Sequence, residues 1–503
     1  MFVNNGYLVN RRRKFNCFKW KRGKLCLTIT FFQLIISLLL TLFAVYEETA
    51  DPSERRNSVS KAIGGFDPMT NPIGKYLPHL RDHMMFSLLG LGLSSANSSA
   101  TMLTSLGFNL LTFTFASSWA LLWPNLVTSI HRKPFLSFGI NSIVRSTYYG
   151  LGVTLSLGSL QGKLSPVQCI ILSVIEVPII SLTDYVLSEL QVADKSKGLT
   201  VFTFSVYFGL SVSAIICRYT RIICRKVQNR KSDREMIVLL GTIFTYLAST
   251  SSSSLGDEKY YVALNTFIAV TASCLSAFAV SSLLDSQDRF SIRHVRIGSA
   301  AGFVAMSIIG QYILHVYMVF VCGISVGALS IIMDTQVNPF LFNRLRIHDT
   351  HSIHAAYGFP ALISGLSSSI FAYMADLSSY DCSLYQIFPA RAPASNSSTM
   401  DHNSDKIQVL DQIYSGIGRS ADSQALYQLF GLIFILIISI VTGLITGMIL
   451  IQSIFDPPKK IDLFQDGHYW VLSSEGEDTF ATESLYESDP SPEEMTSRNI
   501  RFS

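Results

Sequence analysis

The chain alternates long apolar windows with short polar connections over most of its length. A hydrocarbon core of about 30 Å needs about 20 mostly apolar residues per helix, and twelve windows of the sequence approach or exceed that length. These windows are 25–46, 83–99, 103–123, 138–160, 167–186, 199–217, 236–254, 261–284, 297–313, 316–333, 355–374 and 426–454. The second window is short and ends in the polar run SSANSSA. The pattern predicts an all-α polytopic membrane protein with about 12 transmembrane helices.

Composition agrees with this prediction. Hydrophobic residues make up 49% of the chain and charged residues only 15%, and the mean hydropathy is +0.35. An ordinary soluble protein carries about 25% charged residues, so a soluble class is excluded. The formal net charge of +4 reflects the basic connections between spans, and we do not expect nucleic-acid binding.

Two basic clusters set the expected orientation. One precedes the first window, and the other follows the sixth: Arg11, Arg12, Arg13, Lys14, Lys19, Lys21, Arg22 and Lys24, then Arg218, Arg221, Arg225, Lys226, Arg230, Lys231 and Arg234. Six spans separate them, so both lie on one side, which the positive-inside rule makes the cytoplasm. We therefore expect both termini to be cytoplasmic, in a plasma-membrane protein.

Three regions follow from this topology: a basic cytoplasmic N-terminus over 1–24, a membrane domain over 25–455, and a cytoplasmic tail over 456–503. The run 25–46 is longer than a secretory signal's apolar core and has no A-x-A site, so we expect a retained helix. The tail is acidic and Ser-rich, so we expect most of it to be disordered, either merely solvated or as a binding or phosphorylation segment. Asn396 starts an Asn-Ser-Ser sequon in a predicted outer loop, which predicts glycosylation there.

The stretch 347–365, IHDTHSIHAAYGFPALISG, leads from a histidine-rich run into an apolar window. It resembles the I-x-D-T-C-G-[IV]-[HN]-N-L-H-G-x-P-G motif of the Rh and ammonium-transporter family. The matching residues are Ile347, Asp349, Thr350, Ile353, His354, Gly358 and Pro360. Further segments resemble Rh proteins in the same order, among them LGFNLL at 106–111, GKLSPVQ at 162–168, VYFGLSVS at 206–213 and FQDGHYW at 464–470.

The resemblance implies a fold of two inverted five-helix halves around a pore, preceded by one extra helix, in a subunit of a trimer. In this chain the halves are spans two to six and seven to eleven. The implied partners are ammonium, ammonia or another small neutral molecule, membrane lipid, and either identical subunits or another Rh subunit in a homotrimer or heterotrimer.

Family members face two histidines across the pore, and an imidazole pair can relay a proton because histidine titrates near neutrality. In this chain Phe202 stands at the first position, within DKSKGLTVFTFSVYFGL, and Tyr357 at the second. Neither side chain relays protons at neutral pH, because Phe has no exchangeable proton and the pKa of Tyr is about 10. Either Tyr357 offers one hydrogen bond to a permeating molecule, or the two aromatics pack the pore shut.

Other family positions are also altered. Ser252 stands where relatives carry a gating phenylalanine, and Tyr148 or its neighbour Tyr149 stands at the facing gate position. Asp194 matches the family aspartate that caps a helix near the outer recruitment site. Asp184 replaces a glutamate and is expected to face an outer vestibule.

Two further groups of polar residues fall in or near spans. We expect Glu176 and Arg145 to pair, since pairing lowers the cost of burying each charge. His348, His351 and His354 are either the polar start of a helix or, less favoured, part of a metal site, and His354 is a candidate for a displaced pore imidazole. No metal or cofactor is predicted.

The sequence contains no Walker loop, no G-x-S-x-G and no H-E-x-x-H, so we do not expect an enzyme. The resemblance implies a channel-like transporter for ammonium or ammonia. Two alternatives stay open: a non-conducting Rh subunit with an assembly or structural role, and passage of a neutral gas such as carbon dioxide.

Overall fold

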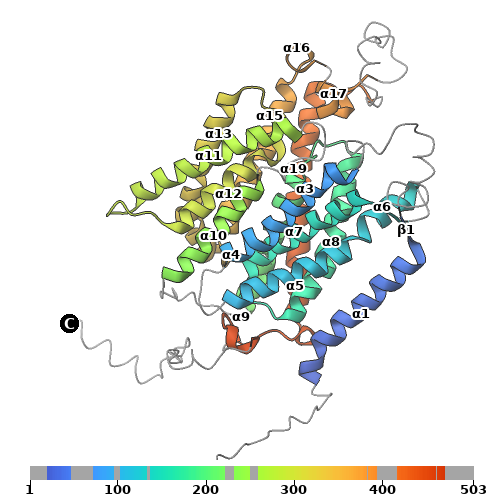
Figure 1. Ribbon diagram of the computed structural model, residues 1–503, viewed down its shortest axis with the longest axis vertical. Helices are drawn as coiled ribbons and strands as arrows, with labels where there is room; N and C mark the ends of the chain where they lie inside the picture. The colour runs from blue at the N-terminus through green and yellow to red at the C-terminus, as the bar shows by residue number, and fades with distance from the viewer. Residues whose placement is uncertain are drawn as a thin grey trace, which may run out of the picture.

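The computed structural model describes residues 20–46, 72–95, 102–132, 136–220, 232–249, 259–381, 383–393, 416–459 and 462–470. Within these ranges the protein is a helical bundle (Figure 1). Labels α, β and η denote α-helices, strands, and π or 3-10 segments. The first part of the chain holds α1 (Trp20–Phe43), β1 (Ala44–Tyr46), α3 (Pro72–Met84), η2 (Met85–Leu91), α4 (Gly92–Ser94), α5 (Met102–Ala120), α6 (Trp123–Arg132), β2 (Leu136–Phe138), α7 (Ile140–Leu160), α8 (Pro166–Glu189), η3 (Gly198–Thr203) and α9 (Phe204–Thr220).

The rest of the chain supplies the second half, the last span and the tail. Its elements are α10 (Ser232–Ser249), α11 (Lys259–Leu284), α12 (Ile292–Ile309), α13 (Val316–Ile332), η4 (Met333–Val337), α14 (Asn338–Phe340), η5 (Leu341–Leu345), η6 (His354–Gly358), α15 (Phe359–Met374), α16 (Leu377–Tyr380), α17 (Ser383–Ile387), η7 (Pro389–Arg391), α19 (Ala421–Leu450), η9 (Ser453–Phe455) and η11 (Asp466–His468).

Each of the twelve predicted windows contains a helix. In the described ranges, nine helices are long and apolar enough to cross a membrane, and α10 contributes a shorter apolar run. The other two windows hold α7 and the α3–η2–α4 stretch, which carry more polar residues because both line the interior of the bundle. The predicted all-α membrane fold is confirmed.

One feature was not predicted. β1 and β2 form a two-stranded parallel pair, with Ala44 opposite Leu136. Hydropathy does not reveal such a pair, because its hydrogen bonds join backbone groups and its three residues per strand are too few for a periodic pattern.

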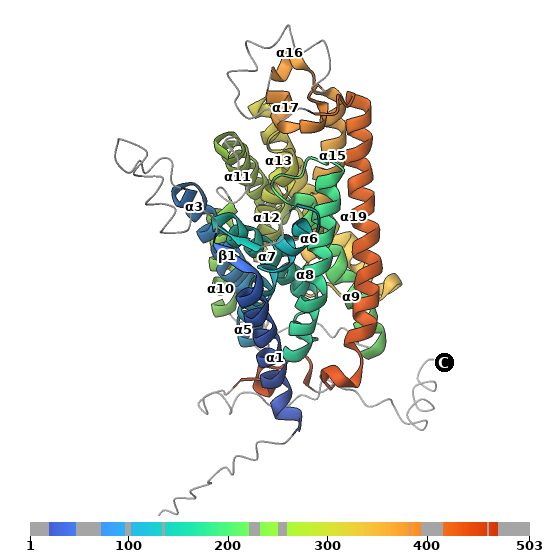
Figure 2. The same cartoon turned by 90° about the vertical axis from the view of Figure 1, so that its right-hand side faces the viewer.

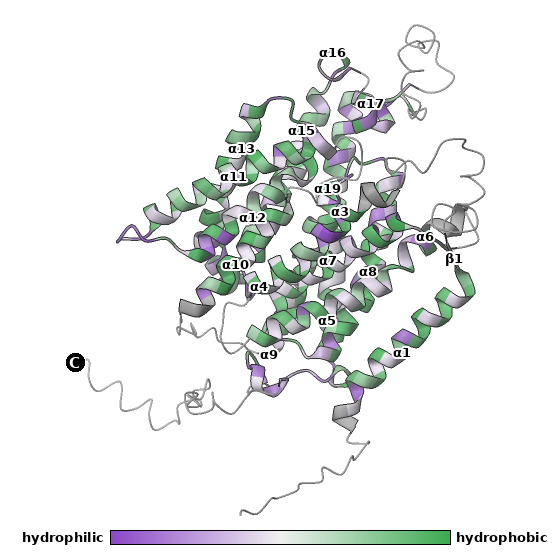
Figure 3. Ribbon diagram, in the orientation of Figure 1, coloured by the Kyte–Doolittle hydropathy of each residue, from purple (hydrophilic) through white to green (hydrophobic). Residues whose placement is uncertain are grey.

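Helix α1 lies at one edge of the bundle (Figure 1), and the view turned by 90° shows it running from the lower end of the bundle up to β1 (Figure 2). Only 6% of its most apolar window is buried. Phe32 anchors it through edge-to-face contacts with Phe115 and Trp119. Apolar residues run along α1 and the other outer helices, whereas hydrophilic residues gather in connections such as the turn after α11 (Figure 3). This apolar perimeter is the surface that a lipid bilayer covers.

The start of α1 and the end of α19 lie at one end of the bundle, where Lys24 Nζ is 3.8 Å from Asp456 Oδ1. We call this the inner end, and the end that carries α16 and α17 the outer end. The segment 462–470 packs on the inner end, where Asp466 accepts hydrogen bonds from Leu103 N and Thr104 N at 2.8 Å. This part of the predicted tail therefore belongs to the folded domain, while residues 471–503 lie outside the described ranges.

The two halves repeat one local arrangement. Asp194 accepts hydrogen bonds from Leu199 N and Thr200 N where η3 begins, and Asp349 accepts them from Ile353 N and His354 N where η6 begins. In both halves an aromatic residue of the π-helical segment follows eight residues after the aspartate: Phe202 and Tyr357.

Helix α19 packs along α9 and α15. A Cβ on Gly443 would lie 2.6 Å from the carbonyl oxygen of Phe208, and one on Gly447 would lie 2.8 Å from Ile215 Cβ. The small residues of α19 thus allow close packing inside this chain. The spacing of Gly443 and Gly447, four residues apart in the last span, predicts close helix approach and, together with the family resemblance, a trimer. In this structure both glycines approach α9 of the same chain, so their spacing does not bear on the trimer.

Candidate functional site

Four aromatic rings close the centre of the bundle between its two halves. Phe202 and Tyr357 are stacked, with ring centroids 6.3 Å apart and planes 6° apart. Phe303 of α12 meets Phe202 edge-on at 5.4 Å, and Phe86 of η2 lies 5.3 Å from Phe303 and 6.3 Å from Tyr357. We call these four residues the aromatic cluster. All four side chains are buried, at 1% to 3% exposure.

The elements that carry these rings have unusual geometry. Phe86, Phe202 and Tyr357 lie in π-helical segments, whereas Phe303 lies in the regular helix α12. A π segment holds one extra residue per turn and is frequent at functional sites. The two aspartate caps described above fix where η3 and η6 begin, so they also set the direction in which Phe202 and Tyr357 point.

On the outer side of the cluster, the ring of Tyr148 lies against that of buried His83, with centroids 3.9 Å apart. Tyr149 points elsewhere, and its hydroxyl donates to Asp184 Oδ2 at 2.7 Å. The two candidates for the facing gate position therefore have different surroundings. Tyr148 packs on the ring of His83 in α3, and Tyr149 belongs to a charged network.

That network centres on the Asp184 carboxylate, whose side chain is 2% exposed. Arg145 Nη2 donates to it at 2.8 Å and Lys197 Nζ at 2.5 Å. Asp184, Asp194 and Lys197 line an outer pocket of about 330 Å³. Asp184 therefore lines an outer depression, although the side chains of Arg145 and Lys197 already neutralise its charge.

The expected pairing of Glu176 with Arg145 was wrong. Glu176 is fully buried and accepts a hydrogen bond from Ser156 Oγ at 2.5 Å. The two side chains diverge because Asp184 lies two helical turns beyond Glu176 on α8, level with Arg145 on α7.

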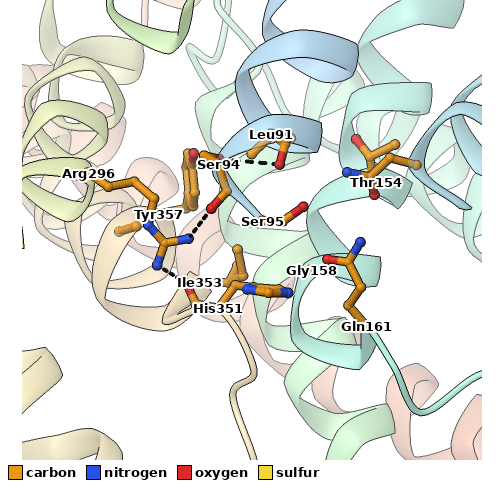
Figure 4. A pocket seen from close by; sticks show the side chains of 12 residues that line it. Leu91, Ser94, Ser95, Thr154, Gly158, Gln161, Arg296, His351, Ile353 and Tyr357 are labelled. Carbon is orange, nitrogen blue, oxygen red and sulfur yellow. Dashed lines mark hydrogen bonds between the residues drawn. The ribbon is translucent and has the colours of Figure 1, made fainter. Parts of the chain in front are cut away.

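On the inner side, Tyr357 forms one wall of a small cavity that we call the inner chamber (Figure 4). Its volume of about 10 Å³ corresponds to one water-sized molecule. Its other lining residues are Leu91, Ser94, Ser95, Asn109, Thr154, Gly158, Gln161, Arg296, His351, Ile353 and Ala356. Arg296 forms part of its wall by donating hydrogen bonds to Ser94 O at 3.1 Å and His351 O at 2.8 Å.

The three histidines near residue 350 diverge. His354 Nδ1 lies 3.4 Å from the Tyr207 hydroxyl, His348 lies near Phe464, and His351 lines the inner chamber. No group of three or more metal-ligating side chains occurs in the described part of the chain. Burial, together with the positive charge of Lys163, lowers the pKa of His348 to about 3, and burial near Arg296 holds the pKa of His351 well below its usual value.

A model of the Ammonium Transporter Family matches residues 79–455. The chain belongs to this family. The match covers both five-helix halves, and it confirms the resemblance described from the sequence.

Relatives within the family include ammonium transporters Rh type B. The protein of Bos taurus is 28% identical over 378 residues, which is 74% of this chain and 78% of the relative. That of Rattus norvegicus is 27% identical over 462 residues, or 91% of this chain and 95% of the relative.

Solved structures of the same fold include Rh50 of Nitrosomonas europaea, with a TM-score of 0.61 and 17% identity over 85% of this chain and 97% of that one. Mep2 of Saccharomyces cerevisiae gives a TM-score of 0.56 and 16% identity over 80% of this chain and 91% of that one. At these identities the likeness concerns the fold.

The structure brings Phe202 and Tyr357 together, as the family resemblance implies, and adds Phe86 and Phe303, which the sequence reasoning missed. Each half contains an aspartate followed eight residues later by an aromatic residue, and this spacing is a sequence signal for Phe202 and Tyr357. No comparable signal marks Phe86 or Phe303. Ser252, at the aligned gate position, and Asn396, at the sequon, lie outside the described residues.

Proposed function

We propose that this family member is a channel-like protein that carries ammonia across a membrane as a neutral molecule. The aromatic cluster is the observation that supports this proposal. An apolar constriction of four rings makes the passage of a bare cation costly, and neither Phe202 nor Tyr357 can relay a proton. A small uncharged molecule needs only transient separation of the rings, and the Tyr357 hydroxyl offers it one polar contact.

The test uses purified protein in vesicles that contain a pH-sensitive dye. An inward ammonium gradient should raise the internal pH faster than in empty vesicles, because entering ammonia binds protons. No membrane current should accompany the change. A current that scales with the ammonium gradient would show that the cation itself crosses.

A second candidate is a non-conducting subunit with an assembly role. The mutual contacts of the four buried rings favour it, because rings packed against one another must separate before any molecule can pass between them. Internal alkalinisation equal to that of empty vesicles would support this role. A parallel experiment with a carbon dioxide gradient, which acidifies the vesicle interior, tests the neutral-gas alternative.

We propose a trimer of identical or related Rh subunits in the plasma membrane, with the inner end of the bundle cytoplasmic, Asn396 glycosylated outside, and no catalytic activity. The family and the apolar perimeter support a multi-pass membrane protein. Lys24 beside Asp456 supports placing both chain ends on one side.

A further inference from the structure

The inner chamber contains more polar groups than its neighbours can satisfy. Among the described residues, no hydrogen-bond partner reaches Arg296 Nε, either amide atom of Gln161, either ring nitrogen of His351, or Asn109 Oδ1. All four side chains are at least nine-tenths buried. Buried polar atoms normally have partners, so a cavity lined by several such orphans indicates a bound molecule.

The charge of the chamber is also unbalanced. Within the described chain, no carboxylate lies within 4.0 Å of the Arg296 guanidinium, and the Asp334 and Asp349 charges that act on it from farther away are engaged elsewhere. Asp334 accepts a hydrogen bond from Arg293 at 2.7 Å, and Asp349 caps η6. The chamber therefore has a positive potential.

We propose that the inner chamber binds one small monovalent anion of halide size, held by Arg296. A buried guanidinium keeps its charge, so its burial favours an opposite charge nearby. The guanidinium of Arg296 and the unpartnered amide of Gln161 both belong to residues that line the chamber, and both are donor groups suited to an anion. A water molecule would satisfy hydrogen bonds and leave the charge unbalanced, and an ammonium ion would be repelled. The chamber has room for one water-sized molecule, so a monatomic anion such as chloride, which is somewhat larger, requires a small outward movement of the lining side chains, and a carboxylate ligand requires a much larger one.

This proposal is independent of whether ammonia crosses the protein, and it can be tested without a flux measurement. The thermal unfolding midpoint of the purified full chain is measured in detergent at constant ionic strength while sodium gluconate is replaced by sodium bromide. A ligand that binds only the folded state raises the midpoint. We expect a saturable rise of a few degrees with bromide, and the same with chloride.

Two variants test the site. Arg296→Gln should abolish the halide-dependent rise. Gln161→Glu places a carboxylate in the chamber; it should also abolish the rise while raising the midpoint measured in gluconate. Because Gln161→Glu supplies the missing charge, it keeps the test decisive if Arg296→Gln does not fold.

Arg289→Gln serves as the matched control, since Arg289 is 69% exposed and pairs with Asp285 away from the chamber. It should retain the full halide response. The proposal is overturned if parent protein shows no difference between bromide and gluconate, or if the response persists in Arg296→Gln or Gln161→Glu. Anomalous diffraction from bromide-soaked crystals should place a single peak beside Arg296, and a peak elsewhere only would likewise overturn it.

Discussion

The ring of Phe202 lies parallel to the ring of Tyr357, with 6.3 Å between centroids, although 155 positions separate the two residues in the chain. One comes from each inverted half, and the resemblance puts both at positions of paired histidines. If these rings close the path, Phe202→His combined with Tyr357→His should raise methylammonium or ammonia flux in vesicles several-fold above the parent. Each single change should raise the flux less, because a lone buried imidazole leaves a nitrogen without a hydrogen-bond partner, which costs the folded protein about 1 to 3 kcal/mol of stability.

The matched control for that double variant is Phe202→Leu with Tyr357→Leu, which replaces both rings with smaller side chains and adds no titratable group. If the leucine pair conducts as well as the histidine pair, the gain comes from space alone. If the parent already conducts as well as the histidine pair, the rings do not close the path.

The Asp184 network should dominate the stability of the outer end. Asp184→Asn leaves Arg145 and Lys197 without their common partner, and breaking a buried ion pair costs about 3 to 5 kcal/mol. The free energy of unfolding in detergent should fall accordingly. Asp285→Asn, which removes an exposed i,i+4 pair with Arg289, should leave it nearly unchanged. Equal losses in the two variants would contradict a special role for Asp184.

Close packing of α19 on α9 gives another prediction. Gly443→Ala places a methyl group 2.6 Å from the Phe208 carbonyl oxygen, so one helix must shift. We expect a loss of about 1 to 3 kcal/mol in unfolding free energy, as for other overpacked interiors. Gly23→Ala in α1 meets no atom within 4 Å and should be neutral or slightly stabilising, because alanine favours a helix over glycine. A stable Gly443→Ala variant would show that the two helices are not in tight contact.

The inner-end histidines predict a dependence of stability on pH. The pKa of His348 is lowered to about 3 and that of His351 well below its usual value, so both stay neutral in the folded protein. In the unfolded chain they take up protons below about pH 6.5. The unfolded state then binds more protons, and stability falls as the pH drops from about 6.5 towards 3. In the double variant His348→Gln with His351→Gln, the unfolding midpoint should decrease less as the pH is lowered over this range. An unchanged pH dependence would show that other groups cause the decrease.

The proposed topology can be tested on intact cells. An epitope tag after Ser503 should bind antibody only after the membrane is permeabilised, because the basic clusters and the contact of Lys24 with Asp456 put both chain ends on the inner side. Asn396→Gln should remove any mobility shift caused by a glycosidase. Antibody binding to unpermeabilised cells would reverse the orientation.

Hydropathy was sufficient to locate the twelve helices, because a membrane imposes length and apolarity on every span. It could not identify which acid pairs with Arg145, since Glu176 and Asp184 lie on the same helix and only the packing of α7 on α8 distinguishes them. Gly443 and Gly447 marked a close helix contact correctly, but sequence alone could not tell a contact within the chain from one between subunits. No sequence pattern pointed to Arg296. The absence of a carboxylate beside its guanidinium, among the described residues, can be seen only in the three-dimensional structure.

The π-helical turns that carry Phe86, Phe202 and Tyr357 also bear on how this chain relates to its homologues. Each turn contains one residue more than an α-helical turn, so deleting that residue would restore regular hydrogen bonding without moving the rest of the span. These are therefore the points in the membrane domain where a one-residue insertion or deletion is best tolerated during evolution. A homologue without one of these extra residues would present the neighbouring side chain at the centre of the bundle, and its sequence would be one position out of register there.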